Sequence, residues 1–296
     1  MLPKNIKYLF LLLVCFFLSL SIANAAHFSL DQAKVRLVIP PGGSQTGEIR
    51  IDNISGENLD VRVYWEDWAY AQGNDGSKDF LASNSTTYSA AKFVTFSPGE
   101  FIIPPFGRQT VSYVVRLPED AKSGYYGVLF FESTLGKYAS PGDSDISERQ
   151  AGIDVALRMA SLFYIETKGK NNRKAEIGNF SLSGNKDGSP LLIEAEFLNA
   201  GDVDLTAGGS FNIMDSKGMV YARGKFKDVY TLPGNKTKLT AEWKNGISQG
   251  TYSLIATIDI GKSQEESGLE RGPVIVKEAK IQIGPAGEIV SVRQLD

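Results

Sequence analysis

The sequence predicts an all-β protein built of two immunoglobulin-like sandwiches in tandem. Three observations lead to this fold class. Apolar residues alternate with polar ones over short stretches, which is the period of half-buried strands and not of helices. Clusters of Gly, Pro, Asn and Asp separate these stretches, as turns do. Each half of the chain holds about seven such stretches in about a hundred residues, which is typical of a sandwich.

The first 25 residues predict a signal peptide that is removed from the mature protein. Lys4 and Lys7 precede the apolar run YLFLLLVCFFLSLSI, and a small-x-small cleavage pattern ends at Ala25. A membrane anchor is the less favoured alternative, because the run is short for a bilayer span of roughly 20 residues. We therefore expect an exported protein that is periplasmic or, alternatively, secreted or associated with the cell surface.

The residue inventory excludes several classes of function. The single cysteine, Cys15, leaves with the signal peptide, and the single histidine, His27, lies near the new amino terminus. Disulfides, thiol chemistry, Cys/His zinc sites and a Ser-His-Asp triad are therefore not expected. Loss of Lys4 and Lys7 changes the net charge from −3 to −5, and no basic stripe for nucleic acid is present. We expect a protein that is not an enzyme and carries no cofactor or metal.

The first predicted sandwich extends over residues 27–167. Its main predicted strands are VRLVI (35–39), EIRID (48–52), VRVYW (61–65), VSYVVRL (111–117) and YYGVLFF (125–131). The polar segment ETKGKNNRKAE (166–176) has no apolar period, and we place the boundary between the domains there.

The second predicted sandwich extends over residues 168–284. Its predicted strands are LLIEAEFL (191–198), SFNIMD (210–215), MVYAR (219–223), TKLTAEW (237–243), TYSLIATIDI (251–260) and VIVKEAKIQI (274–283). Residues 285–296 are expected to form a C-terminal tail, with a short added strand as the alternative.

Two nearly identical turn sequences occur in the first half, IPPGGSQT (39–46) and IPPFGRQT (103–110). TLPGNKTKLTAEW (231–243) is a looser third copy. The prolines cannot donate ladder hydrogen bonds, so they end a strand, and the glycine permits the reversal. We interpret each copy as a corner between strands, which is favoured over a repeated ligand loop.

A second motif occurs once in each half, as Gly124-Tyr125-Tyr126 and Gly250-Thr251-Tyr252. Each copy precedes a strongly apolar strand. In immunoglobulin-like sandwiches a tyrosine at this place packs its ring inward and bonds its hydroxyl back to the preceding corner. Two copies at matching places favour two related sandwiches over ordinary core tyrosines.

Two acidic constellations are weaker signals. Glu66 and Asp67 lie beside Trp65 and Trp68, but neighbouring residues of a strand point to opposite faces and cannot act together as a glycosidase pair. The loop GNDGSKD (73–79) offers oxygen ligands but lacks the later Glu of a calcium loop, so a surface turn is expected.

Residues 28–166 carry a series of segments in a recognisable order. These are SLDQAKVRLVIPPGGSQTGEIRIDNISGENLDVRVYWEDW, SPGEFIIPPFGRQTVSYVVRLP, GYYGVLFFES (124–133) and IDVALRMASLFYIE (153–166). In that order they resemble the N-terminal domain of periplasmic pilus-assembly chaperones of the chaperone–usher type. The second half is more similar to generic immunoglobulin-like modules of bacterial surface and envelope proteins.

The resemblance implies that the last strand of the first domain is lent to a pilus subunit that lacks a strand, which is a form of strand addition. The alternating face of that strand would be Ile153, Val155, Leu157 and Met159. Alignment on the Leu-Phe-Tyr cluster that begins at Leu162 shifts this face by one residue. Alternation is also what any core-facing strand shows. The preceding polar segment 133–150 suits a mobile loop that orders on binding.

The resemblance also implies a cationic clamp for the subunit's terminal carboxylate, made by an Arg of the first strand and a Lys of the last. Arg36 matches the Arg position. The Lys position falls on Ser161, so we expect Arg158, three residues earlier, to complete the clamp, with Lys168 as the alternative. Paired cations are suited to a carboxylate.

The functional hypothesis from the sequence is an exported chaperone-like protein that binds pilus or surface-fibre subunits by donor-strand complementation. Its partners would be such a subunit and an outer-membrane usher. The alternative hypothesis is a structural or adhesive envelope protein that binds a surface protein or cell wall without a chaperone cycle.

Overall fold

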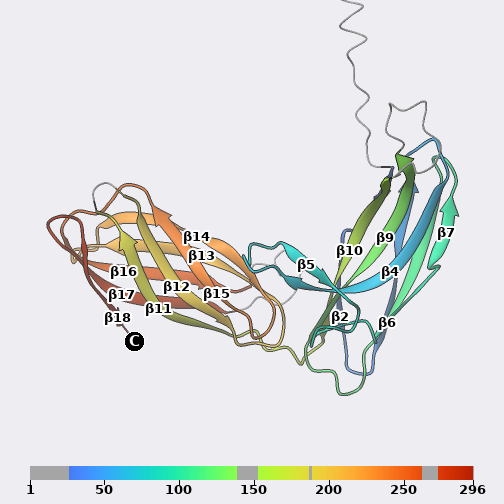
Figure 1. Ribbon diagram of the computed structural model, residues 1–296. Helices are drawn as coiled ribbons and strands as arrows, with labels where there is room; N and C mark the ends of the chain where they lie inside the picture. The colour runs from blue at the N-terminus through green and yellow to red at the C-terminus, as the bar shows by residue number, and fades with distance from the viewer. Residues whose placement is uncertain (1–26, 139–152, 187–188, 262–272, 296) are drawn as a thin grey trace, which may run out of the picture.

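The chain folds into two β-sandwiches in tandem, which confirms the predicted fold class (Figure 1). The computed structural model describes residues 27–138, 153–186, 189–261 and 273–295. The predicted signal peptide, residues 1–25, lies outside the described residues. Within the described ranges, no helix is long and apolar enough to cross a membrane.

The first sandwich is formed by two sheets. Its strands are β1 (Phe28–Leu30), β2 (Lys34–Ile39), β3 (Ser44–Asn53), β4 (Leu59–Tyr70), β5 (Lys78–Leu81), β6 (Val94–Ser97), β7 (Glu100–Ile103), β8 (Arg108–Arg116), β9 (Gly124–Tyr138) and β10 (Ile153–Thr167). One sheet has the order β1-β3-β8-β6, and the other has the order β2-β10-β9-β4-β5, with β7 also paired to β4. The period-two segments of the sequence form the long strands, because alternation buries one face of each. Residues 133–138, predicted as part of a loop, instead continue β9.

The beginning of the chain is divided between the two sheets of the first sandwich. β1 pairs antiparallel with β3, whereas β2 pairs parallel with β10. The core between the sheets includes Ile49, Ile51, Val111, Phe131 and Phe163, all fully buried. The alternation of β2 buries Val35, Leu37 and Ile39 in this core, so that the intervening residues lie on the outer face of the sheet.

The second sandwich has a core of its own. Its strands are β11 (Ala175–Gly184), β12 (Leu191–Asn199), β13 (Leu205–Met214), β14 (Val220–Thr231), β15 (Lys236–Trp243), β16 (Gly250–Asp259), β17 (Val274–Ile283) and β18 (Ile289–Leu295). The sheets have the orders β11-β12-β15 and β14-β13-β16-β17-β18. Its core includes Phe197, Phe211 and Leu254. At the end of the chain, residues 289–295 form β18, which pairs with β17. This agrees with the alternative of a short added strand. The exact domain limits 27–167, 168–284 and 285–296 stay predictions.

The three related corner sequences form the same kind of turn. Gly43 N–H donates to Pro40 at 2.9 Å, Gly107 N–H to Pro104 at 2.9 Å, and Asn235 N–H to Leu232 at 3.0 Å. The third residue of each turn has a positive φ: 71° at Gly42, 55° at Phe106 and 80° at Gly234. Proline at the second position and a positive φ at the third define a type II turn.

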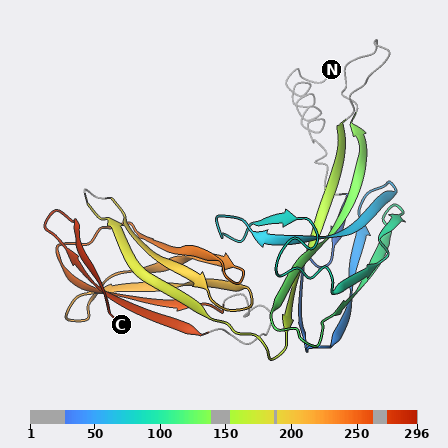
Figure 2. The same ribbon diagram turned by 60° about the horizontal axis from the view of Figure 1, so that its bottom comes forward.

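The end of β4 and strand β5 form a hairpin arm, residues 67–81, that extends from the first sandwich to the second (Figures 1 and 2). At its tip, Asn74 accepts a hydrogen bond from Tyr230 N–H at 2.8 Å, and its amide donates to the Tyr230 carbonyl at 2.9 Å. A separate cluster of buried side chains lies at this junction. Its members are Trp68, Tyr126, Val128, Phe130, Tyr164 and, from the second sandwich, Leu232.

Candidate functional site: a strand edge and a cationic face

The candidate donor strand β10 pairs on both sides over only part of its length. β9 accompanies it from Ile153 to Glu166, whereas β2 accompanies it only from Leu162 to Thr167. Among the described strands, residues 153–161 therefore have no partner on the side of β2. An unpaired row of backbone N–H and C=O groups is a template for an added strand.

The side chains of β10 alternate between two environments. Leu157 and Met159 are half-buried and pack against the core of the first sandwich. Ala160 and Leu162 are also half-buried but pack against the junction cluster. The side chains of the other two predicted donor residues, Ile153 and Val155, lie outside the described part of the structure, as do residues 139–152.

Arg158 lies on the outer face of β10 and is held by neighbouring side chains. Its guanidinium carbon is 3.8 Å from the centroid of the Phe130 ring. Its Nη1 lies 3.3 Å from the Tyr64 hydroxyl and 3.4 Å from Glu66 Oε1. The Tyr64 hydroxyl also donates to Glu132 at 2.7 Å. Arg158 thus belongs to a local network of charge and aromatic contacts on the sheet face.

Arg36 lies at the junction of the two sandwiches and is far from Arg158. It is the register partner of Tyr164, and its guanidinium carbon is 4.2 Å from that ring's centroid. Tyr164 is six residues beyond Arg158 on β10, which at about 3.3 Å per residue is about 20 Å. The structure therefore does not bring the two arginines of the predicted clamp together.

The other positions considered for the clamp also lie away from Arg36. Ser161 is fully buried on the core-facing side of β10, opposite to the face that carries Arg36 and Tyr164. Lys168 follows the end of β10, where its N–H donates to the Ile39 carbonyl at 2.9 Å.

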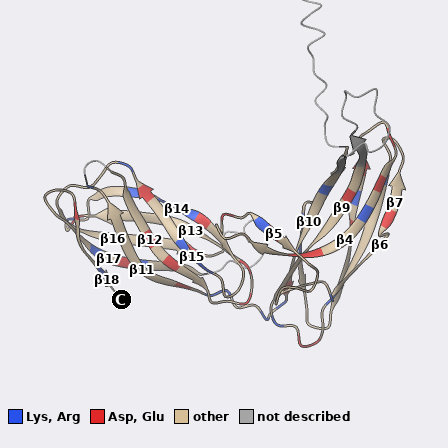
Figure 3. Cartoon of the chain, in the orientation of Figure 1, with Lys and Arg blue, Asp and Glu red and all other residues tan. Residues whose placement is uncertain are grey.

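Two lysines instead share the face of Arg36. Lys34 is two residues earlier on β2, and its Nζ lies 5.7 Å from the centroid of the Tyr164 ring. Lys78 comes from the arm, where its Nζ lies 5.3 Å from Trp68 and 5.1 Å from Tyr70. Burial, together with the charges of Lys34 and Arg36, lowers the pKa of Lys78. Both signs of charge are interspersed over the rest of the chain (Figure 3), so this grouping of three cations is a local feature.

The arm that supplies Lys78 is anchored at its root by a buried carboxylate. Asp67 is fully buried and accepts hydrogen bonds from Ser85 N–H, Thr86 N–H and hydroxyl, and the Ser89 hydroxyl, at 2.6 to 3.1 Å. Trp68 donates from its indole to the Gly127 carbonyl at 3.0 Å. The loop expected as a surface turn, residues 73–79, is the tip of this arm. Its contact with the second sandwich could not be predicted from the sequence, because the two segments are more than 150 residues apart.

Asp204 of the second sandwich faces Arg36 from the other side, and sequence reasoning missed this residue. Its Oδ2 lies 3.5 Å from Arg36 Nη2, and its backbone N–H donates to the Tyr126 hydroxyl at 2.6 Å. Arg36 and Asp204 side chains are 11% and 0% exposed. Burial lowers the pKa of Arg36, but the Asp204 charge and other interactions outweigh it, and the pKa is raised overall.

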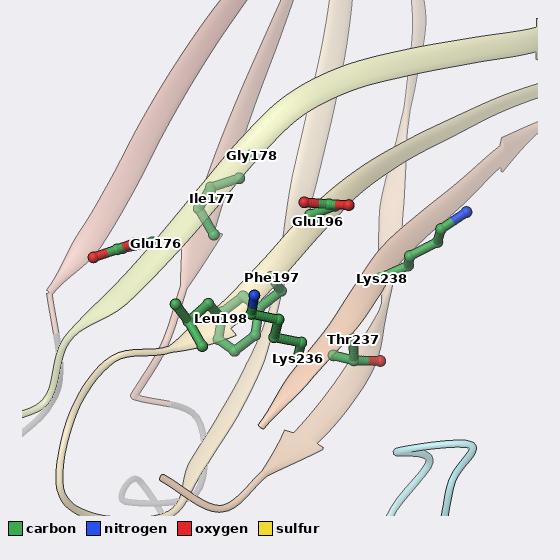
Figure 4. A pocket seen from close by; sticks show the side chains of 9 residues that line it. All are labelled: Glu176, Ile177, Gly178, Glu196, Phe197, Leu198, Lys236, Thr237 and Lys238. Atoms are coloured by element: carbon green, nitrogen blue, oxygen red, sulfur yellow. The ribbon is translucent and has the colours of Figure 1, made fainter. Parts of the chain in front are cut away.

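A shallow hollow lies elsewhere, on the small sheet of the second sandwich (Figure 4). Its volume is about 440 Å³. A register shift between β11 and β12 places Gly178, which has no side chain, beside Glu196. The charged residues around the hollow are Glu176, Glu196, Lys236 and Lys238, and Lys238 is paired with Glu194 at 3.2 Å. Mixed and partly paired charges give this hollow no preference for one ligand class.

Comparison with known proteins gives a similarity of fold. No protein-family model and no curated protein matches the chain. Among solved structures, it is similar to a chain of the chaperone–tip adhesin complex described as vital for synergistic activation of CFA/I fimbriae biogenesis. The identity is 12%, the TM-score is 0.50, and the match covers 86% of this chain and 98% of that one. The class 5 fimbriae chaperone CfaA matches with 12% identity and a TM-score of 0.47 over 85% and 98% of the two chains. The protein therefore has the two-sandwich fold of the chaperone–usher pilus chaperones, as the resemblance in its sequence predicted.

Proposed function

We propose that this protein is an exported, periplasmic chaperone that holds a pilus or surface-fibre subunit by strand addition at β10. The observation that carries the proposal is the edge of β10 at residues 153–161, which has no partner on the side of β2 among the described strands, whereas β10 is paired on both sides from Leu162. Main-chain hydrogen bonds along such an edge supply affinity, and alternating side chains supply specificity. The half-buried Leu157 and Met159 are the described members of the predicted donor face.

The second part of the proposal is a clamp for the subunit's terminal carboxylate. Its cations differ from those that the sequence predicted. Arg36 keeps its predicted role, and Lys78 and Lys34 take the role first given to Arg158. The cations lie on one face beside Tyr164, where the partial burial of Arg36 and Lys78 strengthens a charge-assisted hydrogen bond. An outer-membrane usher would receive the complex.

The strand-addition step is tested by co-expression with candidate secreted subunits. Leu157→Glu should reduce the amount of co-purified subunit at least tenfold, because a charge would enter the interface. Ala156→Glu is the matched control, since Ala156 is exposed on the neighbouring position. Equal capture by both variants and the unmodified protein would exclude β10 as the donor strand.

Because Leu157 also contacts the core, a measurement on the unmodified protein is needed as well. Some backbone amides of residues 156–161 do not pair with β9. When a subunit is bound, hydrogen exchange should slow at these amides. Exchange that is unchanged there while the subunit remains bound would place the interface elsewhere.

The clamp is tested by replacing one cation at a time. Lys78→Ala should weaken capture of a subunit with its native carboxyl terminus about fivefold to tenfold, and Arg36→Ala should weaken it more. Lys122→Ala is the matched control, because Lys122 is exposed on the first sandwich. Lys78 would be excluded from the clamp if its replacement had no more effect than that of Lys122.

A further inference from the structure

Asp204 faces Arg36 across the two sandwiches in an arrangement that is unusual for a settled ion pair. The side chain of Asp204 is fully buried, and the two groups approach only to 3.5 Å. Among the described residues, neither Asp204 Oδ1 nor Oδ2 accepts a hydrogen bond, and Arg36 Nη1 donates none. A stable Arg–carboxylate pair normally forms shorter and often bidentate hydrogen bonds.

A buried carboxylate needs such compensation, because removal of a charge from water is costly. Asp204 obtains it from the guanidinium of Arg36 and is held in place by its backbone hydrogen bond to the Tyr126 hydroxyl. The backbone N–H and the carboxylate of Asp204 thus both contact the first sandwich. Arg36 is the cation of the predicted clamp, so Asp204 lies where that clamp would bind a carboxylate.

We propose that Asp204 occupies the carboxylate position of Arg36 in the free chain, and that a partner's terminal carboxylate must displace it. The partner's part in this inference rests on the proposed function, whereas the occupancy of the site by Asp204 does not. The site is therefore capped by the protein itself until a partner binds.

Displacement of Asp204 has a structural consequence. A side chain with no exposed surface can reach water only if the second sandwich moves away from the first. Such movement also strains the contact of Asn74 with Tyr230 at the tip of the arm. Carboxylate binding and separation of the sandwiches are therefore linked, and each must change the other's equilibrium by the same factor.

The occupancy is tested by chemical rescue, without any subunit. Asp204→Ala deletes a carboxylate, and formate has the size and charge of the deleted group. Formate should raise the melting temperature of this variant in a saturable manner, because a ligand that binds only the folded state stabilises it. Sodium chloride at the same ionic strength and formamide, which lacks the charge, should not.

Two variants serve as controls for the rescue. In Asp204→Asn the amide fills the space, so formate should have no specific effect. In Asp60→Asn an exposed acid of β4 is neutralised, and formate should again act no differently from chloride. A formate effect equal to that of chloride in folded Asp204→Ala would overturn the proposal.

A second experiment measures capture of a subunit. It distinguishes a failure of this inference from a failure of the proposed function, and it can be done even if Asp204→Ala does not fold. Asp204→Asn should increase capture of a subunit with a free carboxyl terminus at least threefold, because Arg36 holds a neutral amide less strongly than a carboxylate and a tightly bound partner can displace it where formate cannot. It should not change capture of a subunit whose terminus is amidated. Unchanged capture by Asp204→Asn, with binding otherwise intact, would overturn the displacement step. Rescue by formate without capture of any subunit would support the role of Asp204 and count against the chaperone function.

Discussion

The two Gly-x-Tyr corners have the same sequence pattern but different hydrogen bonds. In the second sandwich, the Tyr252 hydroxyl donates to the Ser248 carbonyl at 3.0 Å, so the tyrosine closes its own corner as predicted. In the first sandwich, the Tyr126 hydroxyl accepts from the backbone N–H of Asp204, which belongs to the other sandwich. The expectation of a local bond was therefore wrong for Tyr126.

The difference arises from what lies beyond each corner. The second sandwich packs on the first corner, and Tyr126 contacts Trp68 and Tyr164 at ring-centroid distances of 5.4 and 6.0 Å. Among the described residues, the ring of Tyr252 contacts that of Tyr221 at 5.2 Å. One motif can therefore serve a single domain or join two, depending on which surface covers it.

The largest expected effect concerns the buried tryptophan of the junction. Trp68→Ala should lower the free energy of unfolding by about 3–5 kcal/mol, because it removes a large buried side chain. Trp243→Ala, in the half-buried tryptophan of the second sandwich, should cost less. Urea unfolding of both variants measures this contrast. Equal losses would mean that the junction cluster is no more important than a peripheral contact of the second core.

The glycines of the two corners should also differ. A methyl group on Gly124 would overlap the Tyr126 hydroxyl, whereas one on Gly250 would lie 3.0 Å from the Tyr252 hydroxyl. We expect Gly124→Ala to cost about 2–3 kcal/mol and Gly250→Ala about 1 kcal/mol or less, as overpacking does. Thermal unfolding compares them, and a larger loss for Gly250→Ala would contradict the view that the first corner is the more constrained.

Removal of the two hydroxyls sharpens the comparison. Tyr126→Phe leaves the buried N–H of Asp204 without its acceptor and should cost about 1–3 kcal/mol. Tyr252→Phe leaves one partly buried carbonyl and should cost about 0.5–1.5 kcal/mol. In addition, only Tyr126→Phe should increase the radius of gyration in solution scattering. An unchanged radius would indicate that this bond does not hold the sandwiches together.

The last contrast is a dependence of stability on alkaline pH. Burial raises the pKa of Tyr164 to about 12 and the pKa values of Tyr70 and Tyr126 well above the ordinary value. Unfolded tyrosines lose their protons near pH 10, whereas these retain them in the folded state. Stability is therefore full below pH 10, and Tyr164 alone should lower it by about 1.4 kcal/mol per unit between pH 10 and 12.

Tyr164→Phe checks this sign. The variant should show a smaller loss of stability between pH 10 and 12 than the unmodified protein, measured by urea unfolding at each pH. Tyr252→Phe serves as the comparison from the other corner. A slope unchanged by Tyr164→Phe would exclude it as one of the groups responsible.

Much of the fold could be predicted because long strands leave a period-two pattern. β12 and β17 were predicted almost to their ends, and the three corners follow from proline and glycine chemistry. β1, β5 and β7 are only three or four residues long, too short for alternation to be read. Phe106 takes the positive φ that Gly42 and Gly234 take in the other corners, which a glycine rule does not predict.

The candidate site was less predictable than the fold. The resemblance selected β10 and Arg36, but the cationic face also requires Lys78 from an arm that the sequence presented as a polar turn. Arg158 was predicted to join Arg36, yet strand geometry places it about 20 Å away.

The two sandwiches, their main strands and their corners could be derived from the sequence alone, because alternation and turn chemistry act between residues close in the chain. The folded chain was needed to show that β2 pairs with only part of β10, that the arm reaches Tyr230, and that Asp204 faces Arg36. These contacts join residues from different strands and domains. They depend on how finished elements pack, and no local pattern of side chains encodes that packing.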